Sequence, residues 1–589
     1  TATAGYGFIW VSGSTPNELY FMDDAGTAHN IMGSGTIGGS VSANYIPYAS
    51  SADTLADFAL AYTEADNLII GTTPASITTD ADGNTSLGAG ALNKITDGDK
   101  NVAVGMYAAR SGTTAKHSVA VGNEAARLGI TGNYNVSVGY QANYSGTKDA
   151  NVIIGYQAAV DAATQSGSVA IGYRAARYPQ GNYNTAIGMQ ALQGNASVTT
   201  ANNNVAVGYQ AGHDITSGYR NTLVGFQAGY DIESGLDNTL IGQQAGANVT
   251  TGPRNTIVGS YAGDALTTVD GVVAIGYAAL GAGAGASYDV AIGYEAHSAG
   301  TSSGVFIGLQ AGANLAGAGT FIGKEAGESA TEQYAVLIGE EAGKNSATNH
   351  TVAIGHGSAL SADATKSQFM GSYAGGTWSG NNSTVIGYQA GYSGTNTTQT
   401  DNIAIGYQSM LGGNYSVSNL SNVAMGVAAL KFASGSSYNV ALGYGAMYAA
   451  DQTSTQTVAI GYKALSGATG TEGTTAVGHL AARDLTTGDS HVAIGKSAML
   501  KVTTTSYNTV VGVDALSDVD GAGSTTAVGF GAMKYSSADN ATGIGQYALS
   551  GATGDKNAAL GNSAGAIAKG SANSVMVGYQ AGFHPTGNH

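Results

Sequence analysis

The sequence predicts an all-β protein, a parallel β-solenoid in which one short phrase is repeated through most of the 589 residues. An apolar run ends on a glycine, and this pattern recurs in thirty copies from Gly88 to Gly578. An alanine stands three residues after the glycine in twenty-eight copies, and Ser358 and Ser409 replace it in the other two. A fixed period of about 17 residues is typical of a solenoid, in which each repeat is one coil stacked on the previous one.

The glycine and the alanine of each repeat have a steric interpretation. Glycine allows a positive φ where the coil turns, and alanine suits a corner where neighbouring backbones come close. Asparagine precedes the strand in fourteen copies, and its amide is expected to bond the adjacent backbone or to stack as a ladder. Structural roles are predicted for Gly105 with Ala108, Gly208 with Ala211, Gly225 with Ala228, and Gly578 with Ala581.

Each repeat contains a short strand that is apolar on both faces. Val, Ile and Leu dominate the positions one and three before the glycine, and the position between them is also apolar, as at Ala103, Leu223 and Phe306. Alternation along a strand places these two sets on opposite faces. The interior of one coil covers one face only, so we expect another chain alongside. A homotrimer is the simplest closed arrangement, and we expect no folded monomer.

Composition argues against several classes of function. The net charge of −17 argues against nucleic acid and anionic membrane surfaces as partners. No run of eighteen apolar residues is present, so we expect no membrane insertion. Charged residues are only 10% of the chain and cysteine is absent, which leaves few groups for acid–base or thiol chemistry. We therefore expect no enzymatic activity, no cofactor and no metal site.

Two short motifs imitate catalytic ones. GNSAG (561–565) matches a nucleophile pattern centred on Ser563, and SHVAIGKS (490–497) nearly matches a phosphate loop with Lys496. Both segments are also ordinary copies of the repeat, and neither has the strand-to-helix context that its chemistry requires. We interpret both as repeat copies.

Aromatic residues are the candidates for contact with another molecule. Tyrosine follows the repeat glycine in eleven copies, and a periodic aromatic row could stack on sugar rings or form a structural ladder along a coil corner. Trp378 lies in a glycine-rich loop, where an exposed indole could also be a sugar platform or could pack against a neighbouring chain. The candidate contact residues are Trp378, Tyr140, Tyr156, Tyr209, Tyr388 and Tyr407.

Two resemblances add to this interpretation. The phrase N-x-A-[IV]-G-x-x-A, over about 84–582, resembles the head repeat of trimeric autotransporter adhesins. That resemblance implies a left-handed parallel β-roll of about 30 coils, with three chains around one axis. PNELYFMDDAGTAHNI (16–31) and the segment 46–75 resemble stretches near the start of phage tail-fibre and virion appendage proteins. We therefore expect a small β-rich attachment region, 1–80, followed by a repeat shaft, 81–589.

The resemblances imply a structural function in host attachment, as the shaft of a phage tail fibre or virion appendage, located in the virion. The implied partners are two further copies of the chain, a tail, baseplate or adaptor protein bound through 1–80, and a host surface glycan or a distal tip protein. Fibres of this kind are often made with a C-terminal chaperone that cuts itself off, and we expect the same here. A bacterial trimeric surface adhesin is the alternative, although no heptads of a stalk follow the repeats, and a glycan-cleaving tailspike is the third interpretation.

Overall fold

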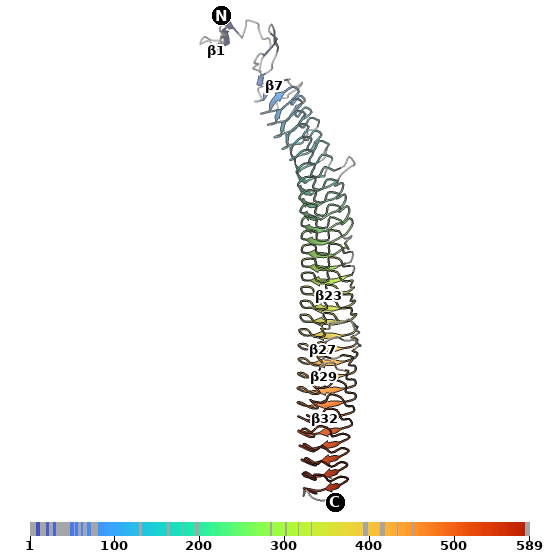
Figure 1. The fold of residues 1–589 in the computed structure, drawn as a ribbon. Helices are drawn as coiled ribbons and strands as arrows, with labels where there is room; N and C mark the ends of the chain where they lie inside the picture. The colour runs from blue at the N-terminus through green and yellow to red at the C-terminus, as the bar shows by residue number, and fades with distance from the viewer. Residues whose placement is uncertain are drawn as a thin grey trace, which may run out of the picture. The chain divides into compact units, whose positions relative to one another are not determined.

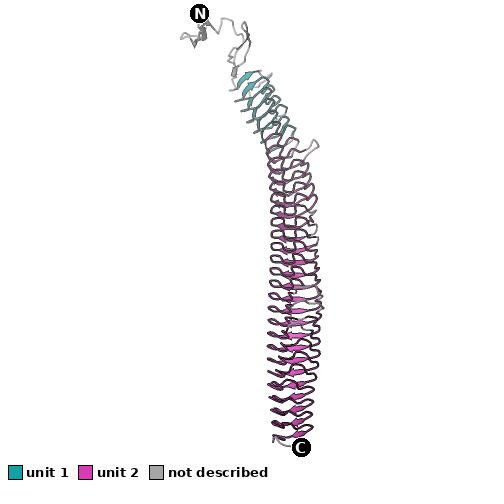
Figure 2. Cartoon of the chain, in the orientation of Figure 1, with its two compact units in different colours: residues 1–168 teal, residues 169–589 magenta. Residues whose placement is uncertain are grey.

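The structure is a computed structural model, and it describes two compact units, 1–168 and 169–589 (Figure 2). Up to residue 80 it describes only short strands and Asn67. From 81 to 583 the described residues are continuous except for 129–131, 162–164, 179–180, 195–199, 283–284, 301–302, 316, 332, 393–398, 413–418, 433 and 450–452. The boundary expected at residue 80 lies at the edge of 72–80, outside the described residues.

The first unit contains twelve short strands in its described residues. Strands β1, β2 and β3 form an antiparallel sheet, and β4 pairs with β5 in the same sense. Strand β6 is antiparallel to β7, and from β7 to β12 each strand lies parallel to the next. The strands are β1 (Phe8–Val11), β2 (Leu19–Met22), β3 (Ala28–Asn30), β4 (Tyr48–Ser51), β5 (Thr54–Ala56), β6 (Leu60–Tyr62), β7 (Leu68–Gly71), β8 (Thr85–Gly88), β9 (Val102–Val104), β10 (Val119–Val121), β11 (Val136–Val138) and β12 (Val152–Ile154).

The second unit is a stack of coils, each with one short strand that pairs parallel to the strand of the next coil (Figure 1). The strands are β13 (Val169–Ile171), β14 (Thr185–Ile187), β15 (Val205–Val207), β16 (Thr222–Val224), β17 (Thr239–Ile241), β18 (Thr256–Val258), β19 (Val273–Ile275), β20 (Val290–Ile292), β21 (Gly304–Ile307), β22 (Gly319–Ile322), β23 (Ala335–Ile338), β24 (Val352–Ile354), β25 (Gln368–Met370), β26 (Thr384–Ile386), β27 (Ile403–Ile405), β28 (Val423–Met425), β29 (Val440–Leu442), β30 (Val458–Ile460), β31 (Thr475–Val477), β32 (Val492–Ile494), β33 (Thr509–Val511), β34 (Thr526–Val528), β35 (Thr542–Ile544), β36 (Ala558–Leu560) and β37 (Val575–Val577).

The interior of a coil is filled from three positions of the repeat. In the coil of β16 these are Leu223 at the middle of the strand, Ala228 three residues after the repeat glycine, and Ile232 seven residues after it, and all three are 0% exposed. Because strands alternate, the residues before and after Leu223 face out of the coil. The middle residue of the strand therefore faces the coil interior, and the two residues beside it form the outer face.

A repeat glycine lies directly against the backbone of the repeat glycine in the next coil. Gly105 has φ of +127°, and a Cβ built there would lie 2.5 Å from the carbonyl oxygen of Gly122 in the next coil. Neither the backbone conformation nor the space allows a larger residue, which confirms the steric prediction. Ala108, Ala211 and Ala228 are fully buried, whereas Ala581 in the last described coil is half-buried.

Left-handed backbone also occurs at residues other than glycine. The second residue after the repeat glycine has a positive φ, as at Gln227 with φ of 54°. Its N–H donates a 2.8 Å hydrogen bond to the carbonyl oxygen of Tyr209 in the preceding coil. Its carboxamide nitrogen donates a 3.0 Å bond to Oε1 of Gln210. Bonds between coils therefore offset the strain that a left-handed residue introduces.

The structure confirms an all-β parallel solenoid with coils of about 17 residues, and its described residues contain no helix. The repeat length is visible in the hydrogen bonds, since Asn101 bonds to Asn84 across a separation of 17 residues.

Candidate functional site

The outer face of the strands is the first candidate for an interaction surface. The residue directly before the repeat glycine defines a row that we call the outer apolar column. Every member is aliphatic or methionine: Leu87, Val104, Val121, Val138, Ile154, Ile171, Ile187, Val207, Val224, Ile241, Val258, Ile275, Ile292, Ile307, Ile322, Ile338, Ile354, Met370, Ile386, Ile405, Met425, Leu442, Ile460, Val477, Ile494, Val511, Val528, Ile544, Leu560 and Val577.

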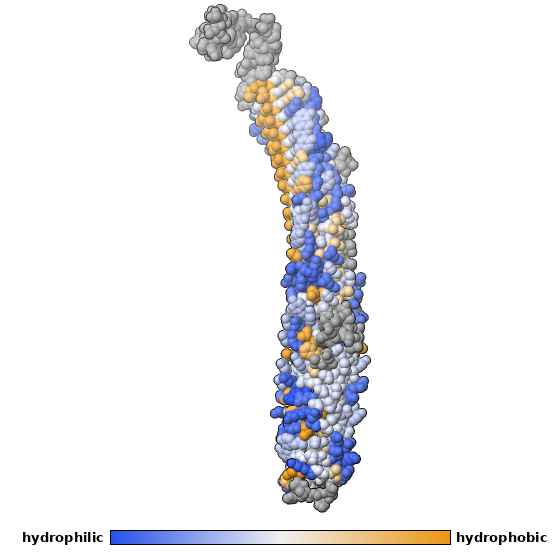
Figure 3. All heavy atoms as spheres, in the orientation of Figure 1, coloured by the Kyte–Doolittle hydropathy of each residue, from blue (hydrophilic) through white to orange (hydrophobic). Residues whose placement is uncertain are grey.

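These side chains are only half covered by their own chain. Ile241 is 37% exposed, although Leu240 beside it on the same strand is 0% exposed. Figure 3 shows the apolar surface as an orange band along one side of the coils that follow β7. A contiguous exposed apolar surface is unusual for a soluble protein, which makes this row of side chains a candidate interaction surface.

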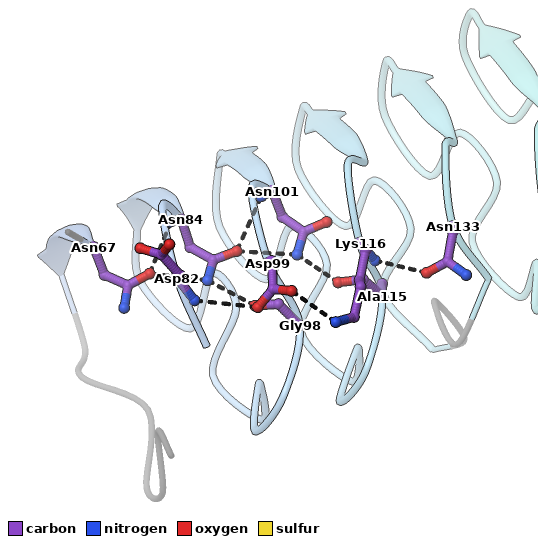
Figure 4. A network of polar contacts seen from close by, with 9 residues as sticks. All are labelled: Asn67, Asp82, Asn84, Gly98, Asp99, Asn101, Ala115, Lys116 and Asn133. Atoms are coloured by element: carbon purple, nitrogen blue, oxygen red, sulfur yellow. Dashed lines mark hydrogen bonds and ion pairs between the residues drawn. The ribbon is translucent and has the colours of Figure 1, made fainter. Parts of the chain in front are cut away.

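Asparagine side chains at the start of many strands lie inside the coils and form ladders, the first of which contains Asn67, Asn84 and Asn101 (Figure 4). Oδ1 of Asn84 accepts hydrogen bonds from the backbone N–H of Asn101 at 2.9 Å and from its Nδ2 at 3.0 Å. Nδ2 of Asn84 donates to Oδ1 of Asn67 at 2.9 Å and to the carbonyl oxygen of Gly98 at 2.8 Å. The side chain thus bonds the backbone and also stacks as a ladder, which are the two roles predicted for it. Each amide satisfies buried polar groups of two coils, as a buried polar row requires.

Two ionisable residues replace asparagine in this ladder. Asp289 is buried and accepts hydrogen bonds from the N–H groups of Ala286 at 2.7 Å and Gly304 at 2.8 Å. Burial raises the pKa of Asp289 to about 6. His491 is also buried, and burial lowers the pKa of its imidazole. Both shifts oppose the charged form, because burial removes the charge from water.

The predicted tyrosine contacts are exposed and stacked on one another. Tyr140 is 40% exposed and its ring lies 5.2 Å from that of Tyr156 at an interplanar angle of 23°. Tyr388 and Tyr407 stack at 5.5 Å and 13°, and Tyr209 stacks on Phe226 at 5.1 Å. The ring faces therefore cover each other within a stack. Stacking between coils is the arrangement expected of a structural ladder.

Trp378 is buried within its own chain, which contradicts both roles considered for it, a surface sugar platform and packing against a neighbouring chain. The indole is 1% exposed and makes an edge contact with Phe369 at 6.4 Å. Trp378 stands seven residues after the repeat glycine Gly371, the position that Ile232 fills in its own coil. Room for the ring exists because Gly391 in the next coil lacks a side chain, and a Cβ there would lie 2.6 Å from the indole. The spacing from the repeat glycine was the signal that could have placed this residue inside.

The two motifs that imitate catalytic ones occupy ordinary positions of the repeat in the structure. Ser563 is the second residue after the repeat glycine Gly561, with φ of 55°, and its Oγ donates to Oδ1 of Asn562 at 2.9 Å. Lys496 directly follows the repeat glycine Gly495 and is exposed. Across the described part of the chain, no group of three or more His, Asp or Glu side chains is placed to hold a metal ion.

Surface charges are paired between successive coils. Arg220 bonds Asp237 with Nη2 to Oδ2 at 2.7 Å, and Arg254 pairs with Asp270 in the same way. The arginines lower the pKa of both carboxyls. Pairs this exposed contribute little to stability, but their regular order fits a surface that repeats from coil to coil.

Comparison of the chain with family models, with curated proteins and with solved structures finds no match. Within the described residues, no helix has the length and apolar character needed to cross a bilayer.

Proposed function

We propose that this chain is a structural protein, the repeat shaft of a fibrous appendage. The outer apolar column carries the proposal, because it continues through every copy of the repeat without a polar residue. The groups described inside the coils hold successive coils together: interior side chains, glycines in backbone contact and amide ladders. A stack of coils whose outer strand face is apolar in every repeat is suited to lateral association with other chains.

We propose that the outer apolar column is buried between copies of the chain in a homotrimer with left-handed coils. Parallel strands are normally covered on both faces, and only the inner face is covered within one chain. Three identical copies around an axis would cover the outer face along its length with no new fold. The resemblance to the adhesin head repeat supports both the number of chains and the handedness.

We propose the tail fibre of a phage, or a similar virion appendage, as the particle that carries this shaft. The resemblance of 16–31 and 46–75 to the first segments of such proteins supports this choice. In this proposal residues 1–80 bind a tail, baseplate or adaptor protein, and the shaft or a distal tip protein contacts the host surface. A bacterial surface adhesin remains the alternative, since its head would use the same repeat.

Cysteine labelling tests the trimer directly, because the chain contains no cysteine. Ile241→Cys places a thiol in the outer apolar column, and Thr251→Cys places one on the exposed loop of the same repeat. We expect a maleimide to label Thr251→Cys rapidly and Ile241→Cys at least about tenfold more slowly, with light scattering giving the mass of three chains. Equal labelling rates, or the mass of one folded chain, would contradict the trimer.

The choice of particle has its own test. Antibodies raised against residues 81–589 are applied to virions and to bacterial cells of the source culture, and bound gold is located by electron microscopy. Gold along filaments of the virion is the expected result. Gold on the surface of uninfected cells would overturn it in favour of the adhesin.

A further inference from the structure

A hollow open to solvent lies on the three coils whose strands are β29, β30 and β31. It has a volume of about 400 Å³. This falls in the range of small-ligand sites, about 300–1,000 Å³. Its lining is Tyr444, Tyr448, Lys463, Ser466, Arg483 and Asp484, with Gly445 and Gly467 at its base.

The hollow exists because no aromatic ring covers Gly445, whereas a tyrosine ring covers the glycine at the same position of three other repeats. Gly445 is the second residue after a repeat glycine, and three other glycines occupy that position in the described coils. At each of these, the tyrosine ring of the next coil covers the glycine: Tyr107 over Gly90, Tyr373 over Gly357 and Tyr547 over Gly531. A Cβ on these glycines would meet a ring carbon at 2.6 to 2.8 Å.

At Gly445 the covering residue is a lysine. A Cβ on Gly445 would meet only Cγ of Lys463 at 3.4 Å and Cβ of Tyr448 at 3.9 Å. The place that an aromatic ring takes in three coils is therefore only partly filled in the fourth, by the stem of Lys463. Lys463 forms no ion pair among the described residues, and its Nζ lies 5.5 Å from the ring centre of Tyr462.

The second cation of the hollow is fixed in position. Nε and Nη2 of Arg483 donate to Oδ1 and Oδ2 of Asp484 at 2.6 and 2.5 Å. A bidentate pair of this kind orients the guanidinium, whose other N–H groups remain available as donors. The hydroxyl groups of Ser466, Tyr444 and Tyr448 add neutral hydrogen-bonding groups to the rim.

We propose that this hollow binds a pyranose ring that carries one carboxylate, as in a uronic acid residue of a surface glycan. The ring would lie over Gly445, and its carboxylate would pair with Lys463 beside Arg483. Hydroxyl-rich, solvent-open walls favour a sugar over an apolar ring, which would prefer an enclosed site. The net charge of −17 disfavours a long polyanion, so the proposal is limited to a single anionic residue.

This inference deepens the proposed role at the host surface by naming a ligand class and a position. Its test does not depend on the number of chains or on the particle. The probes are D-glucuronate and, as the neutral control, D-glucose, each titrated into the full chain and followed by saturation-transfer NMR. We expect D-glucuronate to bind at least about tenfold more tightly than glucose, as a charge-assisted contact implies.

Three variants make the test specific. Lys463→Tyr copies the residue that covers the other three glycines, and it should abolish D-glucuronate binding. Lys463→Gln keeps a similar volume and removes the charge, so it should weaken D-glucuronate at least about tenfold and leave glucose unchanged. Lys496→Gln removes an exposed lysine outside the hollow and should change nothing.

The outcomes separate cleanly. Unaltered D-glucuronate binding by Lys463→Tyr, or equal affinity of the wild-type chain for the two sugars, would overturn the proposal. Thermal unfolding of each variant shows whether the coil remains folded, and tyrosine at this left-handed position is already tolerated at Tyr107, Tyr373 and Tyr547. Light scattering on the same samples reports on the trimer separately, so either idea can fail alone.

Discussion

Nδ1 of His491 accepts a hydrogen bond from the backbone N–H of Asn508 at 3.2 Å. In most coils the equivalent backbone N–H donates to the side-chain oxygen of the residue before the preceding strand, which is an asparagine, a serine or a threonine. Nε2 of the same ring lies 2.6 Å from the carbonyl oxygen of Thr505 and donates to it. The imidazole must therefore be neutral, with its proton on Nε2, to replace the amide.

The substitution His491→Asn should make the protein less sensitive to acid. Burial lowers the pKa of His491 from its ordinary 6.5, so the unfolded chain binds the proton more readily than the folded one. The stability that the neutral ring contributes is complete above about pH 6.5 and is lost as the pH falls below it. At pH 5 the variant should gain on the order of 1 kcal/mol over the wild type. Unfolding midpoints between pH 5 and 8 measure this, with His479→Asn as the exposed control; parallel curves for the wild type and His491→Asn would contradict it.

The substitution Asp289→Asn should have the opposite pH profile. The pKa of Asp289 is raised by burial from 3.8 to about 6, so the folded state holds the proton more tightly than the unfolded state. Stability is greatest below about pH 4 and is lost as the pH rises through about 6. The variant should therefore melt at a higher temperature than the wild type at pH 7, with the difference shrinking towards pH 4.

A matched control for Asp289 lies in the preceding repeat. Arg254 lowers the pKa of Asp270, so its ionised form is the stabilising one. Asp270→Asn should lower the melting temperature slightly at pH 7. If both variants shifted the melting temperature in the same direction, the assignment of the two environments would be wrong.

Replacing a repeat glycine separates conformational strain from contact between coils. Gly105 and Gly578 have φ of +127° and +126°, but a Cβ on Gly578 would meet only Cβ of Ala581 at 3.9 Å. Gly578→Ala should therefore cost only the backbone strain, about 1–3 kcal/mol in its own coil. Gly105→Ala adds a collision with Gly122 and should cost clearly more. Hydrogen exchange of the strands next to each site measures the two costs, and equal losses of protection would show that the backbone contact is unimportant.

The fit of Trp378 above Gly391 predicts energetic coupling between them. Gly391→Ala should be strongly destabilising in the wild type, since its Cβ would lie 2.6 Å from the indole. With Trp378→Leu in place the collision with the indole disappears, and the strain at φ of +59° and the contact with Cγ1 of Val385 at 3.0 Å remain. A double-mutant cycle in denaturant should give a coupling of about 0.5–3 kcal/mol. Simple additivity would mean that the indole does not occupy the position described.

The fold was largely predictable because one period dominates the sequence. The spacing of the repeat glycines predicts the coils, and the asparagines before the strands predict their ladder. Alternation also predicts two faces, but the sequence does not say which face is internal, because Leu240 and Ile241 are equally apolar. Burial in the structure resolves that ambiguity.

Other features depend on contacts between coils and were not predicted. Gln227 is left-handed because bonds to the preceding coil compensate for its strain, which no local propensity encodes. Trp378 was expected at the surface from its glycine-rich neighbours, although its place in the repeat is an interior one. The hollow over Gly445 arises from a lysine in the next coil, so it becomes visible only when successive repeats are stacked.

The contact between repeat glycines of successive coils has a consequence for how the number of repeats can change during evolution. Each coil offers its successor the same backbone surface, so a segment removed from one repeat glycine to the next would leave two ends that match as well as before. Gene rearrangements that add or delete whole repeats could thus lengthen or shorten the protein in steps of one coil, while a deletion of another length would misalign the two coils that meet at the junction.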